Sequence, residues 1–414
     1  MNPERDVLLS LDCGSTMTRV IVAEVLDFAE QAGALRFLGF GEVPSQGWRK
    51  GNIADLDPVA SSIQQAVRQA EVTAGISAES AVVGIGGPHI QGLSSRLGWT
   101  FSTHRREIVR EDVHRLMEIA RNIPLPKDRE LLHLVPQEFV LDSQEGIRDP
   151  IGMQGSHLEA KVRLITNSVS ASQNLVKAVN HAGILVETLV LEALAVGEAV
   201  SSPEERELGT LVAVCGGSTC EAVAYHRDGL RLSVSIPIGG DHFTSDIAVG
   251  LHTPLADAET IKKTFGSISP SGGHEGVSFE VPGVGNHLSR FVSRRALVEI
   301  LEPRAQELLA YAQKELRRCG MEQSLGGGVI LTGGGARLHG MCDLAEQLFG
   351  APTRIGLPPK IQGLPEALDS PEYTTVVGLL LYGHRVRKLR APRPQPLTSR
   401  WKNMLSQKSP ESAR

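Results

Sequence analysis

Two stretches of this chain, about 200 positions apart, show the same order of apolar and small polar residues. Residues 8–25 read LLSLDCGSTMTRVIVAEV, and residues 211–228 read LVAVCGGSTCEAVAYHRD. In each, an apolar run enters a Gly-Ser-Thr turn and a second β-prone run leaves it, which predicts a two-stranded hairpin. Gly-rich turns of this kind expose consecutive backbone N–H groups that can hold phosphate. The repetition predicts two phosphate-binding hairpins that face each other in a two-lobed nucleotide clamp.

The segments between and after the hairpins alternate between strand-like and helix-like periodicity. Strands are predicted at residues 35–42, 81–87, 131–141, 158–165 and 231–236, and a strand that runs into a helix at 185–200. Helices are predicted at residues 57–73, 111–121, 170–181 and 256–266, and a long helix at 291–318 that is broken or kinked at Pro303. Sheets edged by helices indicate the α/β class.

Residues 85–165 have a different character from the segments on either side. This stretch contains one amphipathic helix, at 111–121. Two strands, at 131–141 and 158–165, flank a turn-rich connection, QEGIRDPIGMQG. This pattern predicts a self-contained α+β insert between elements of the first lobe. The sequence leaves open whether the insert faces a partner protein or only elaborates the fold.

A third Gly-rich turn follows in GGGVILTGGGARLHG, residues 326–340. It predicts a buried strand, a triple-glycine turn and a helix at about 340–348. Such a turn lets a ligand approach the backbone and points helix N–H groups at it. The motif is weak alone, but it strengthens the nucleotide hypothesis because two phosphate hairpins accompany it.

The C-terminal region changes to a basic composition. Prolines at 392, 394 and 396 predict a stiff linker over 385–396. The next segment, 397–406, predicts an amphipathic helix for the membrane–water interface, with one face formed by Leu397, Trp401, Met404 and Leu405. A disordered basic tail is the alternative. One copy would bind weakly, so firm attachment requires many linked copies and suggests self-association.

Bulk composition narrows the class of protein. The 414 residues can hold two or more domains, and a net charge of −5 gives no indication of nucleic-acid binding. No apolar run approaches a membrane span, and the N-terminus lacks a signal-peptide pattern, so we expect a cytosolic chain. The five cysteines are expected to be reduced.

The order of hairpin, insert, second hairpin, triple-glycine turn and amphipathic tail resembles the actin-like ATPase superfamily. Within it, the chain resembles the FtsA family of bacterial cell-division proteins. The segments that carry the resemblance are SQGWRKGNIADLD (45–57), LLHLVPQEFVLDSQEGIRDPIGMQG (131–155), ERELG (205–209), SIPIGGDHFTSDIAVGLHTPLADAETIK (235–262), VEILEPR (298–304), VILTGGGARLHG (329–340) and RIGLP (354–358). They extend over nearly the whole chain up to about residue 383.

The resemblance implies a two-lobed actin-like fold, with duplicated phosphate-hairpin lobes and an inserted α+β subdomain. The first lobe would comprise 1–84, 166–195 and 360–384, and the insert 85–165. The core of the second lobe would comprise 196–234 and 305–359, and its small subdomain 235–304. The linker and tail helix would follow.

The resemblance also implies ATP and Mg²⁺ between the lobes. Asp12 would hold Mg²⁺ through its waters, and Glu259 and Lys262 would lie near the ribose and base. The implied phosphate and adenosine turns are Asp12, Gly14, Ser15 and Thr16; Gly216, Gly217, Ser218 and Thr219; and Gly333, Gly334 and Gly335.

The partners implied by the resemblance are the tail of the tubulin-like protein FtsZ, further copies of the chain in head-to-tail filaments, membrane lipids and other division proteins. The location would be the cytoplasmic face of the cell inner membrane at the division septum. The FtsZ tail would dock on 235–304, where the basic candidates are Arg290, Arg294, Arg295 and Arg304. A solvated helix face is the alternative interpretation of these arginines.

Three departures from the family pattern bear on hydrolysis. Val214 stands where the second loop usually begins with Asp, Glu221 replaces a second Asp, and Met17 replaces a Lys. Loss of a carboxylate and a cation should weaken hydrolysis more than binding, because the backbone donors remain. We therefore expect slow or absent ATP hydrolysis. The alternatives are an active ATPase or small-molecule kinase of the superfamily, or a pilus-assembly relative; the 131–155 segment and the tail favour the division family.

Overall fold

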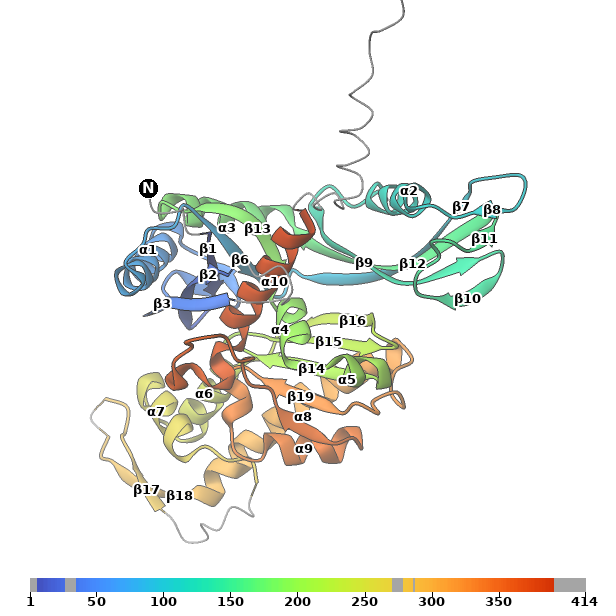
Figure 1. The fold of residues 1–414 in the computed structure, drawn as a ribbon. Helices are drawn as coiled ribbons and strands as arrows, with labels where there is room; N and C mark the ends of the chain where they lie inside the picture. The colour runs from blue at the N-terminus through green and yellow to red at the C-terminus, as the bar shows by residue number, and fades with distance from the viewer. Residues whose placement is uncertain (1–5, 27–34, 270–277, 286, 391–414) are drawn as a thin grey trace, which may run out of the picture.

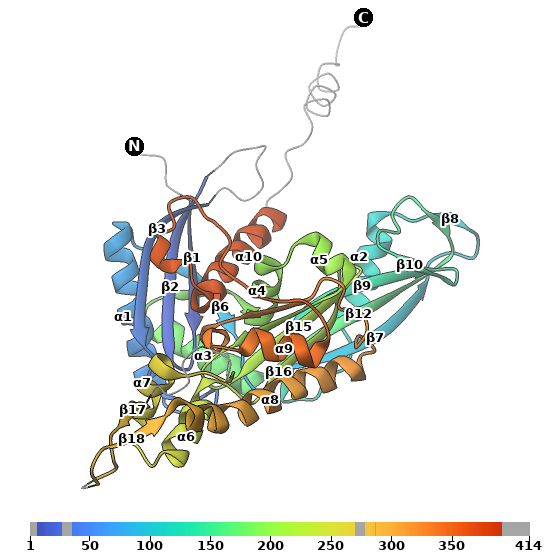
Figure 2. The same cartoon turned by 90° about the horizontal axis from the view of Figure 1, so that it is seen from below.

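The computed structural model describes residues 6–26, 35–269, 278–285 and 287–390. Two lobes stack on each other, and an elongated insert projects sideways from them (Figures 1 and 2). Each lobe is built on its own β-sheet with helices packed against it. The two-lobed α/β fold agrees with the prediction from the sequence.

The first lobe contains a five-stranded sheet in the order β13-β6-β1-β2-β3. Alternate residues of β1 face opposite sides: Leu9 and Leu11 pack toward α1 and α3, and Leu8 packs toward α10. The sheet is therefore covered on both faces. Its elements are β1 (Val7–Cys13), β2 (Met17–Val25), β3 (Leu35–Pro44), β6 (Ser80–Ile85), β13 (Leu185–Leu191), α1 (Leu56–Ala74), α3 (Val169–His181), α4 (Glu192–Val200) and α10 (Thr374–Arg390), with the small hairpin β4 (Trp48–Arg49) and β5 (Asn52–Ile53).

The second lobe repeats the hairpin and extends it. Strands β14 and β15 form the antiparallel pair, and β19 and β20 add to it in parallel. The elements of this lobe are α5 (Pro203–Leu208), β14 (Thr210–Cys215), β15 (Cys220–His226), β16 (Gly229–Ile236), α6 (Gly240–Gly250), α7 (Leu255–Phe265), β17 (Ser278–Val281), β18 (Arg290–Ser293), α8 (Arg294–Arg318), β19 (Val329–Thr332), η1 (Gly334–Arg337), α9 (Met341–Phe349) and β20 (Thr353–Ile355).

The long helix differs from its prediction at two points. It begins at Arg294, because Arg290–Ser293 form β18 and pair with β17. It also runs unbroken through Pro303, which lies on the exposed side of the helix. The carbonyl that loses its hydrogen bond to a proline there can be hydrated, so the helix tolerates this residue.

The insert has its own core, but its main sheet is shared with the second lobe. Leu116 and Ala120 of α2 pack against Leu158 and Ala160 of β12. However, β7 also pairs with β16 of the second lobe, through Gln91 and Val234, so a single nine-stranded sheet spans both units. The prediction of a self-contained insert is wrong in this respect. The elements are β7 (Gln91–Thr100), β8 (Arg106–Glu107), α2 (Arg110–Arg121), β9 (Arg129–Leu141), β10 (Gln144–Ile147), β11 (Gln154–Gly155) and β12 (His157–Ser168).

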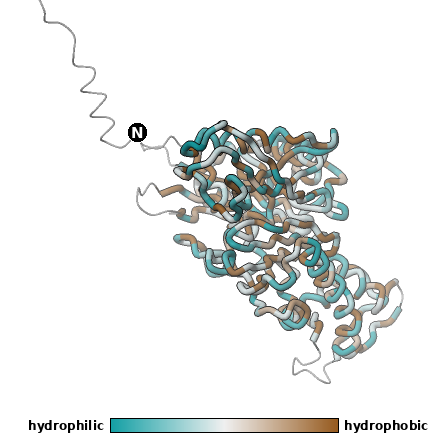
Figure 3. The backbone as a smooth tube through the Cα atoms, turned by 90° about the vertical axis from the view of Figure 1, so that its right-hand side faces the viewer, coloured by the Kyte–Doolittle hydropathy of each residue, from teal (hydrophilic) through white to brown (hydrophobic). Residues whose placement is uncertain are grey.

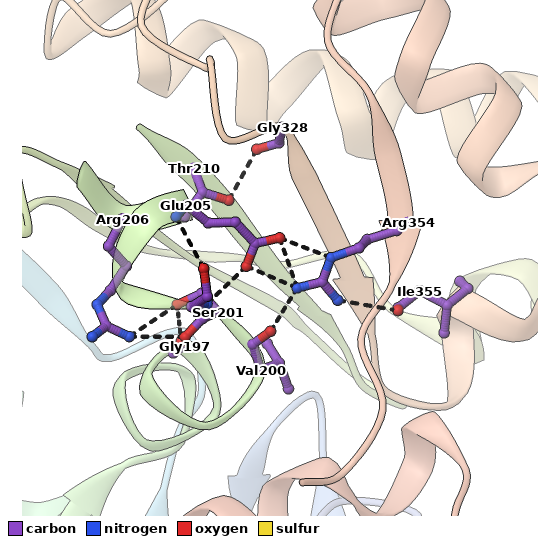
Figure 4. A network of polar contacts seen from close by, with 10 residues as sticks. Gly197, Val200, Ser201, Glu205, Arg206, Thr210, Gly328, Arg354 and Ile355 are labelled. Carbon is purple, nitrogen blue, oxygen red and sulfur yellow. Dashed lines mark hydrogen bonds and ion pairs between the residues drawn. The ribbon is translucent and has the colours of Figure 1, made fainter. Parts of the chain in front are cut away.

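A polar network fixes the end of α4 to the second lobe (Figure 4). The guanidinium of Arg354 donates to both carboxylate oxygens of Glu205 at 2.9 Å and to the carbonyl of Val200 at 2.7 Å. Arg206 donates to the carbonyl of Ser201 at 2.9 Å. These bonds connect the end of α4 to α5 and β20, where the chain enters the second lobe. The chain returns to the first lobe through η2 (Glu366–Leu368) and η3 (Pro371–Tyr373) into α10.

The last described helix belongs firmly to the first lobe. The guanidinium of Arg387 in α10 pairs with the carboxylates of Glu187 at 2.5 Å and Asp6 at 3.1 Å. Because α10 continues to Arg390, the linker predicted at 385–396 begins later than expected. The amphipathic helix predicted at 397–406 lies outside the described residues.

Apolar and polar segments alternate along the backbone of both lobes (Figure 3). Among the helices that the structure describes, none has both the length and the hydrophobicity needed to cross a membrane.

Candidate nucleotide site

The two Gly-rich turns that repeat in the sequence meet face to face between the lobes. The backbone N–H of Ser218 donates to the hydroxyl of Ser15 over 3.1 Å. A Cβ on Gly217 would lie 2.0 Å from Oγ1 of Thr16, so only glycine permits this approach. Residues from chain positions about 200 apart therefore form one surface.

The triple-glycine turn packs against the same place. A Cβ on Gly335 would lie 2.8 Å from Cβ of Cys215, the last residue before the second loop. Gly333 has φ +80°, which favours glycine, and its N–H donates to the carbonyl of Pro371 at 3.0 Å. Gly334, in contrast, has no atom within 4 Å of the Cβ position. A short 3₁₀ turn, η1, separates β19 from α9, and the sequence did not predict it.

Lys262 and Glu259 of α7 lie beside the second loop. Nζ of Lys262 donates to the carbonyl of Gly240 at 2.9 Å and pairs with Glu259 at 2.6 Å. Gly240 in turn donates its N–H to the carbonyl of Gly216 at 2.9 Å. The structure thus brings together the three predicted turns and the predicted α7 pair.

Three carboxylates lie in the interior at the base of the turns. Asp12 is the last but one residue of β1, Glu221 belongs to β15 and Glu192 begins α4. Burial raises the pKa of Asp12 to about 6 and that of Glu221 to about 7, although the Gly87 and Ala193 N–H groups partly stabilise the charged form of Glu221. Burial also raises the pKa of Glu192 well above its usual range, and the charges of Asp12 and Glu221 raise it further.

Glycines at the end of β6 make room for these carboxylates. A Cβ on Gly86 would lie 2.3 Å from Oε1 of Glu221 and 3.0 Å from Oε2 of Glu192. The N–H of Gly87 donates to Oε1 of Glu221. This cluster was not predicted from the sequence. The GIGG run predicts only the exit of a strand at 81–87, although two adjacent glycines after a buried strand are a signal for close approach.

A cavity of about 170 Å³ adjoins both phosphate turns. Its wall includes Ser15 and Thr219 from the turns, Glu192, His89 and the first turn of α3. Glu192 therefore lies beside both Gly-rich turns.

The donor set fits Mg²⁺, the ion that the fold family implies. All three side chains offer carboxylate oxygens, and Oε2 of Glu221 is buried with no hydrogen-bond partner among the described residues. A cation would reduce the electrostatic repulsion among the three carboxylates. Over the described ranges, no group of three or more His, Cys, Asp or Glu side chains could hold a metal by itself. Mg²⁺ bound here would therefore keep waters and share phosphate oxygens, which is its usual preference.

The four arginines predicted for a partner differ in their bonding. Arg304 makes two bonds to Asp246, at 2.7 and 3.1 Å, and so supports the packing of α8 on α6. Arg290 and Arg294 each donate to a backbone carbonyl. Among the described residues, Arg295 pairs with Glu299, one helical turn away, and its side chain is 87% exposed.

Two family models match the chain. The model "Cell division protein FtsA" matches residues 215–378, and the model "SHS2 domain inserted in FTSA" matches residues 87–166. A cell-division protein FtsA of Pseudomonas aeruginosa is 38% identical over 91% of this chain and 89% of that protein. The FtsA of Escherichia coli K12 is 36% identical over 92% and 91%, and that of Bacillus subtilis is 34% identical over 93% and 85%.

Solved structures agree on the fold. The chain superposes on a PilM–PilN type IV pilus biogenesis complex with a TM-score of 0.65 and 17% identity, covering 91% of this chain and 98% of that one. It superposes on MreB5 of Spiroplasma citri bound to ADP with a TM-score of 0.56 and 14% identity, covering 94% and 99%. The fold is therefore actin-like, and the chain belongs to the FtsA family of cell-division proteins.

Proposed function

We propose that this protein binds ATP between its lobes, polymerises on the cytoplasmic membrane and tethers FtsZ filaments to it at the division septum. The observation that carries the proposal is the meeting of three Gly-rich turns at one interlobe surface, with Ser218 bonded to Ser15. Family membership supports the role in cell division. The nucleotide, the filament and the membrane are our inference.

In this proposal, backbone N–H groups of residues 14–16 and 216–219 hold the phosphates, and residues 333–335 approach the adenosine. Lys262 and Glu259 fix the start of α6 against the second loop, beside the ribose and base. Bound Mg²⁺ would neutralise phosphate charge, with Asp12 as its protein-side anchor and Glu192 and Glu221 nearby. Isothermal titration calorimetry of ATP, with and without Mg²⁺, tests this step.

Slow hydrolysis is the preferred form of the proposal. Val214 is buried in an apolar cluster, so the second loop lacks a carboxylate at that position. An active ATPase is the second candidate, and one observation favours it: Glu192 lies on the cavity wall next to both turns. Steady-state phosphate release from the purified full chain distinguishes the two candidates.

The small subdomain offers a surface for an acidic peptide such as the FtsZ tail. Phe291 of β18 and Val249 of α6 are 76% and 73% exposed, respectively, and Arg290 links these elements by donating to the Leu251 carbonyl. Arg295 at the start of α8 adds an exposed cation. Apolar and cationic groups together suit a short peptide that carries both apolar and acidic residues.

Membrane attachment is tested by sedimentation with anionic liposomes. We expect the full chain to pellet with them and a chain ending at Arg390 to stay in the supernatant, because the truncation keeps α10 whole and removes 397–406. ATP should increase pelleting of the full chain if polymerisation adds avidity. Equal pelleting of the truncated chain contradicts the tether.

A further inference from the structure

Strand β7 presents an open edge. It pairs with β12 along its whole length, from Gln91–Thr166 to Thr100–His157, without a register shift. On its other side it pairs only at Gln91, with Val234. From residue 92 to residue 100, alternate backbone N–H and C=O groups therefore point away from β12, and no strand of the described residues lies against them.

This edge lacks the features by which proteins usually protect one. Edge strands are commonly short, bulged or interrupted by proline. β7 has ten residues, no proline and no bulge. Its one charged side chain, Arg96, pairs with Glu159 and Glu145 within the insert. The edge is thus built to accept another strand.

The two faces of the strand set the chemistry of its partner. On the face toward α2, Leu93 is 47% exposed, and Leu97 and Trp99 are half-buried. The guanidinium of Arg115 lies over the Trp99 ring, 5.3 Å from the ring centroid, which is within the roughly 6 Å of a cation–π contact. An added strand would meet apolar side chains and one cation on this face.

The opposite face contains a buried arginine. Arg163 of β12 is 7% exposed; it donates to Oγ of Ser94 at 3.0 Å and to the carbonyl of Ser233 at 3.3 Å. Its Nε has no hydrogen-bond partner among the described residues. No carboxylate of the described residues hydrogen-bonds to this guanidinium, and Glu315 acts on it only through its charge, so burial still lowers its pKa. An incoming carboxylate that bonds to it would reduce the cost of burying this charge.

Arg163 lies where β7 and β16 separate. A Cβ on Gly92 would lie 2.5 Å from Nη2 of Arg163 and 2.2 Å from Oγ of Ser233. The last pairing between the two strands is the adjacent one, Gln91–Val234. A strand added to β7 would therefore begin beside this guanidinium.

We propose that the open edge of β7 binds an extended acidic peptide of a partner protein as an additional β-strand. Its apolar side chains would contact Leu93 and Leu97, and a carboxylate on its other face would reach Arg163. This surface is separate from the small subdomain proposed above for the FtsZ tail. The proposal therefore does not depend on that function.

Charge argues against two occupants from this chain, the β7 strand of a second copy and the segment 397–406. The β7 strand of a second copy, QGLSSRLGWT, contains no acidic residue and would bring another Arg96 to the edge. The segment 397–406, LTSRWKNMLS, also has no acidic residue. Neither can provide a carboxylate for Arg163.

The test uses the full chain and a fluorescent ten-residue peptide of alternating valine and glutamate. Fluorescence anisotropy should show saturable binding, at least tenfold tighter than for the same peptide with lysine in place of glutamate. Hydrogen–deuterium exchange should slow in residues 92–100 when the peptide is present. Absence of saturable binding, or protection confined to other segments, overturns the proposal.

Two substitutions sharpen the test. Leu93→Glu should weaken binding of the acidic peptide at least tenfold, whereas the control Leu185→Glu, at a leucine that is 64% exposed on β13, should leave it unchanged. Arg163→Gln should remove the preference for glutamate over lysine, whereas Arg163→Lys, which keeps the positive charge, should retain part of it. Leu93→Glu, at an exposed position, tests the edge even if both buried variants fold poorly. If Leu93→Glu instead abolishes self-association and leaves peptide binding intact, the edge serves a second copy and the proposal fails.

Discussion

The backbone N–H of Ser218 donates to the hydroxyl of Ser15 over 3.1 Å, and this bond joins the two lobes at their Gly-rich turns. Each residue follows the first strand of its own hairpin. The bond depends on Gly217, whose missing side chain leaves room for Thr16. The site is therefore sensitive to a single methyl group.

We expect Gly217→Ala to weaken ATP binding at least tenfold. The new Cβ would lie 2.0 Å from Oγ1 of Thr16 and 3.0 Å from Oγ of Ser15, so Thr16 must change rotamer or the turns must separate. Separation removes backbone donors from the phosphates, and each lost charge-assisted bond contributes roughly 1.5–3 kcal/mol. Calorimetric titration with ATP measures the effect. Unchanged affinity would mean that the turns already lie apart when nucleotide binds.

Gly334→Ala separates a ligand effect from a folding effect. Because no atom lies within 4 Å of the Cβ position, we expect the melting temperature to stay within a few degrees of the parent. ATP affinity should nevertheless fall if the adenosine packs against this turn, because the methyl group would occupy its place. An unchanged affinity contradicts the adenosine role of the triple-glycine turn.

The nucleotide-free protein should lose stability as pH rises from about 4 to about 7. Glu221 and Asp12 have folded-state pKa values of about 7 and about 6, above the roughly 4 expected in the unfolded chain. The folded state therefore binds more protons than the unfolded state in this window, and stability decreases with pH. Urea unfolding at several pH values measures the slope.

The substitution Glu221→Gln tests the origin of that slope. Glutamine cannot ionise, so the loss between pH 4 and pH 7 should become smaller, by up to about 3 kcal/mol for a shift of this size. Mg²⁺ with ATP should also reduce the slope in the parent protein. A slope that Glu221→Gln leaves intact would assign the pH dependence to other groups.

Glu192→Gln should lower any ATP hydrolysis at least tenfold while ATP affinity changes less than threefold. A general base contributes roughly 10²–10⁴ in rate, and its removal does not touch the backbone donors that hold phosphate. Phosphate release and calorimetry on the same preparation give the two numbers. Equal rates for both proteins would show that Glu192 is not the base.

Arg295→Ala and Arg304→Ala should have opposite consequences. Arg295 is 87% exposed, so its loss should weaken binding of an FtsZ tail peptide and leave the melting temperature unchanged. Arg304 holds Asp246 through two bonds, so its loss should lower the melting temperature. Peptide titration and thermal melting distinguish them. A stable Arg304→Ala protein with lost peptide binding would reverse these assignments.

Local patterns predicted most elements of the fold, because repeated hairpins and amphipathic helices have strong periodicities. Strand β7 was missed: its sequence includes Gly92, Gly98 and three hydroxyl residues, and such composition carries little strand signal. The start of α8 was misplaced because Arg290–Ser293 lie in a short hairpin that depends on pairing with β17. Pairing between distant strands cannot be derived from one segment alone.

The candidate nucleotide site was also predicted only in part. The three Gly-rich turns could be predicted as ligand-binding segments, since glycine patterns are local. The grouping of Glu192 with Asp12 and Glu221 could not, because it depends on how β1, β15 and α4 converge in space. The pairing of Gln91 with Val234, which makes the sheet continuous, could not be predicted from the sequence either.

Arg387 has a consequence for how the molecule would stand on a surface. By pairing with Glu187 and Asp6, it fixes the end of α10 to the first lobe, while the β17–β18 hairpin lies at the opposite end of the molecule (Figure 1). A chain anchored through the segment after α10 would keep its first lobe stationary against the lipid. Rotation of the second lobe relative to the first would then change the distance between the β17–β18 hairpin and that surface.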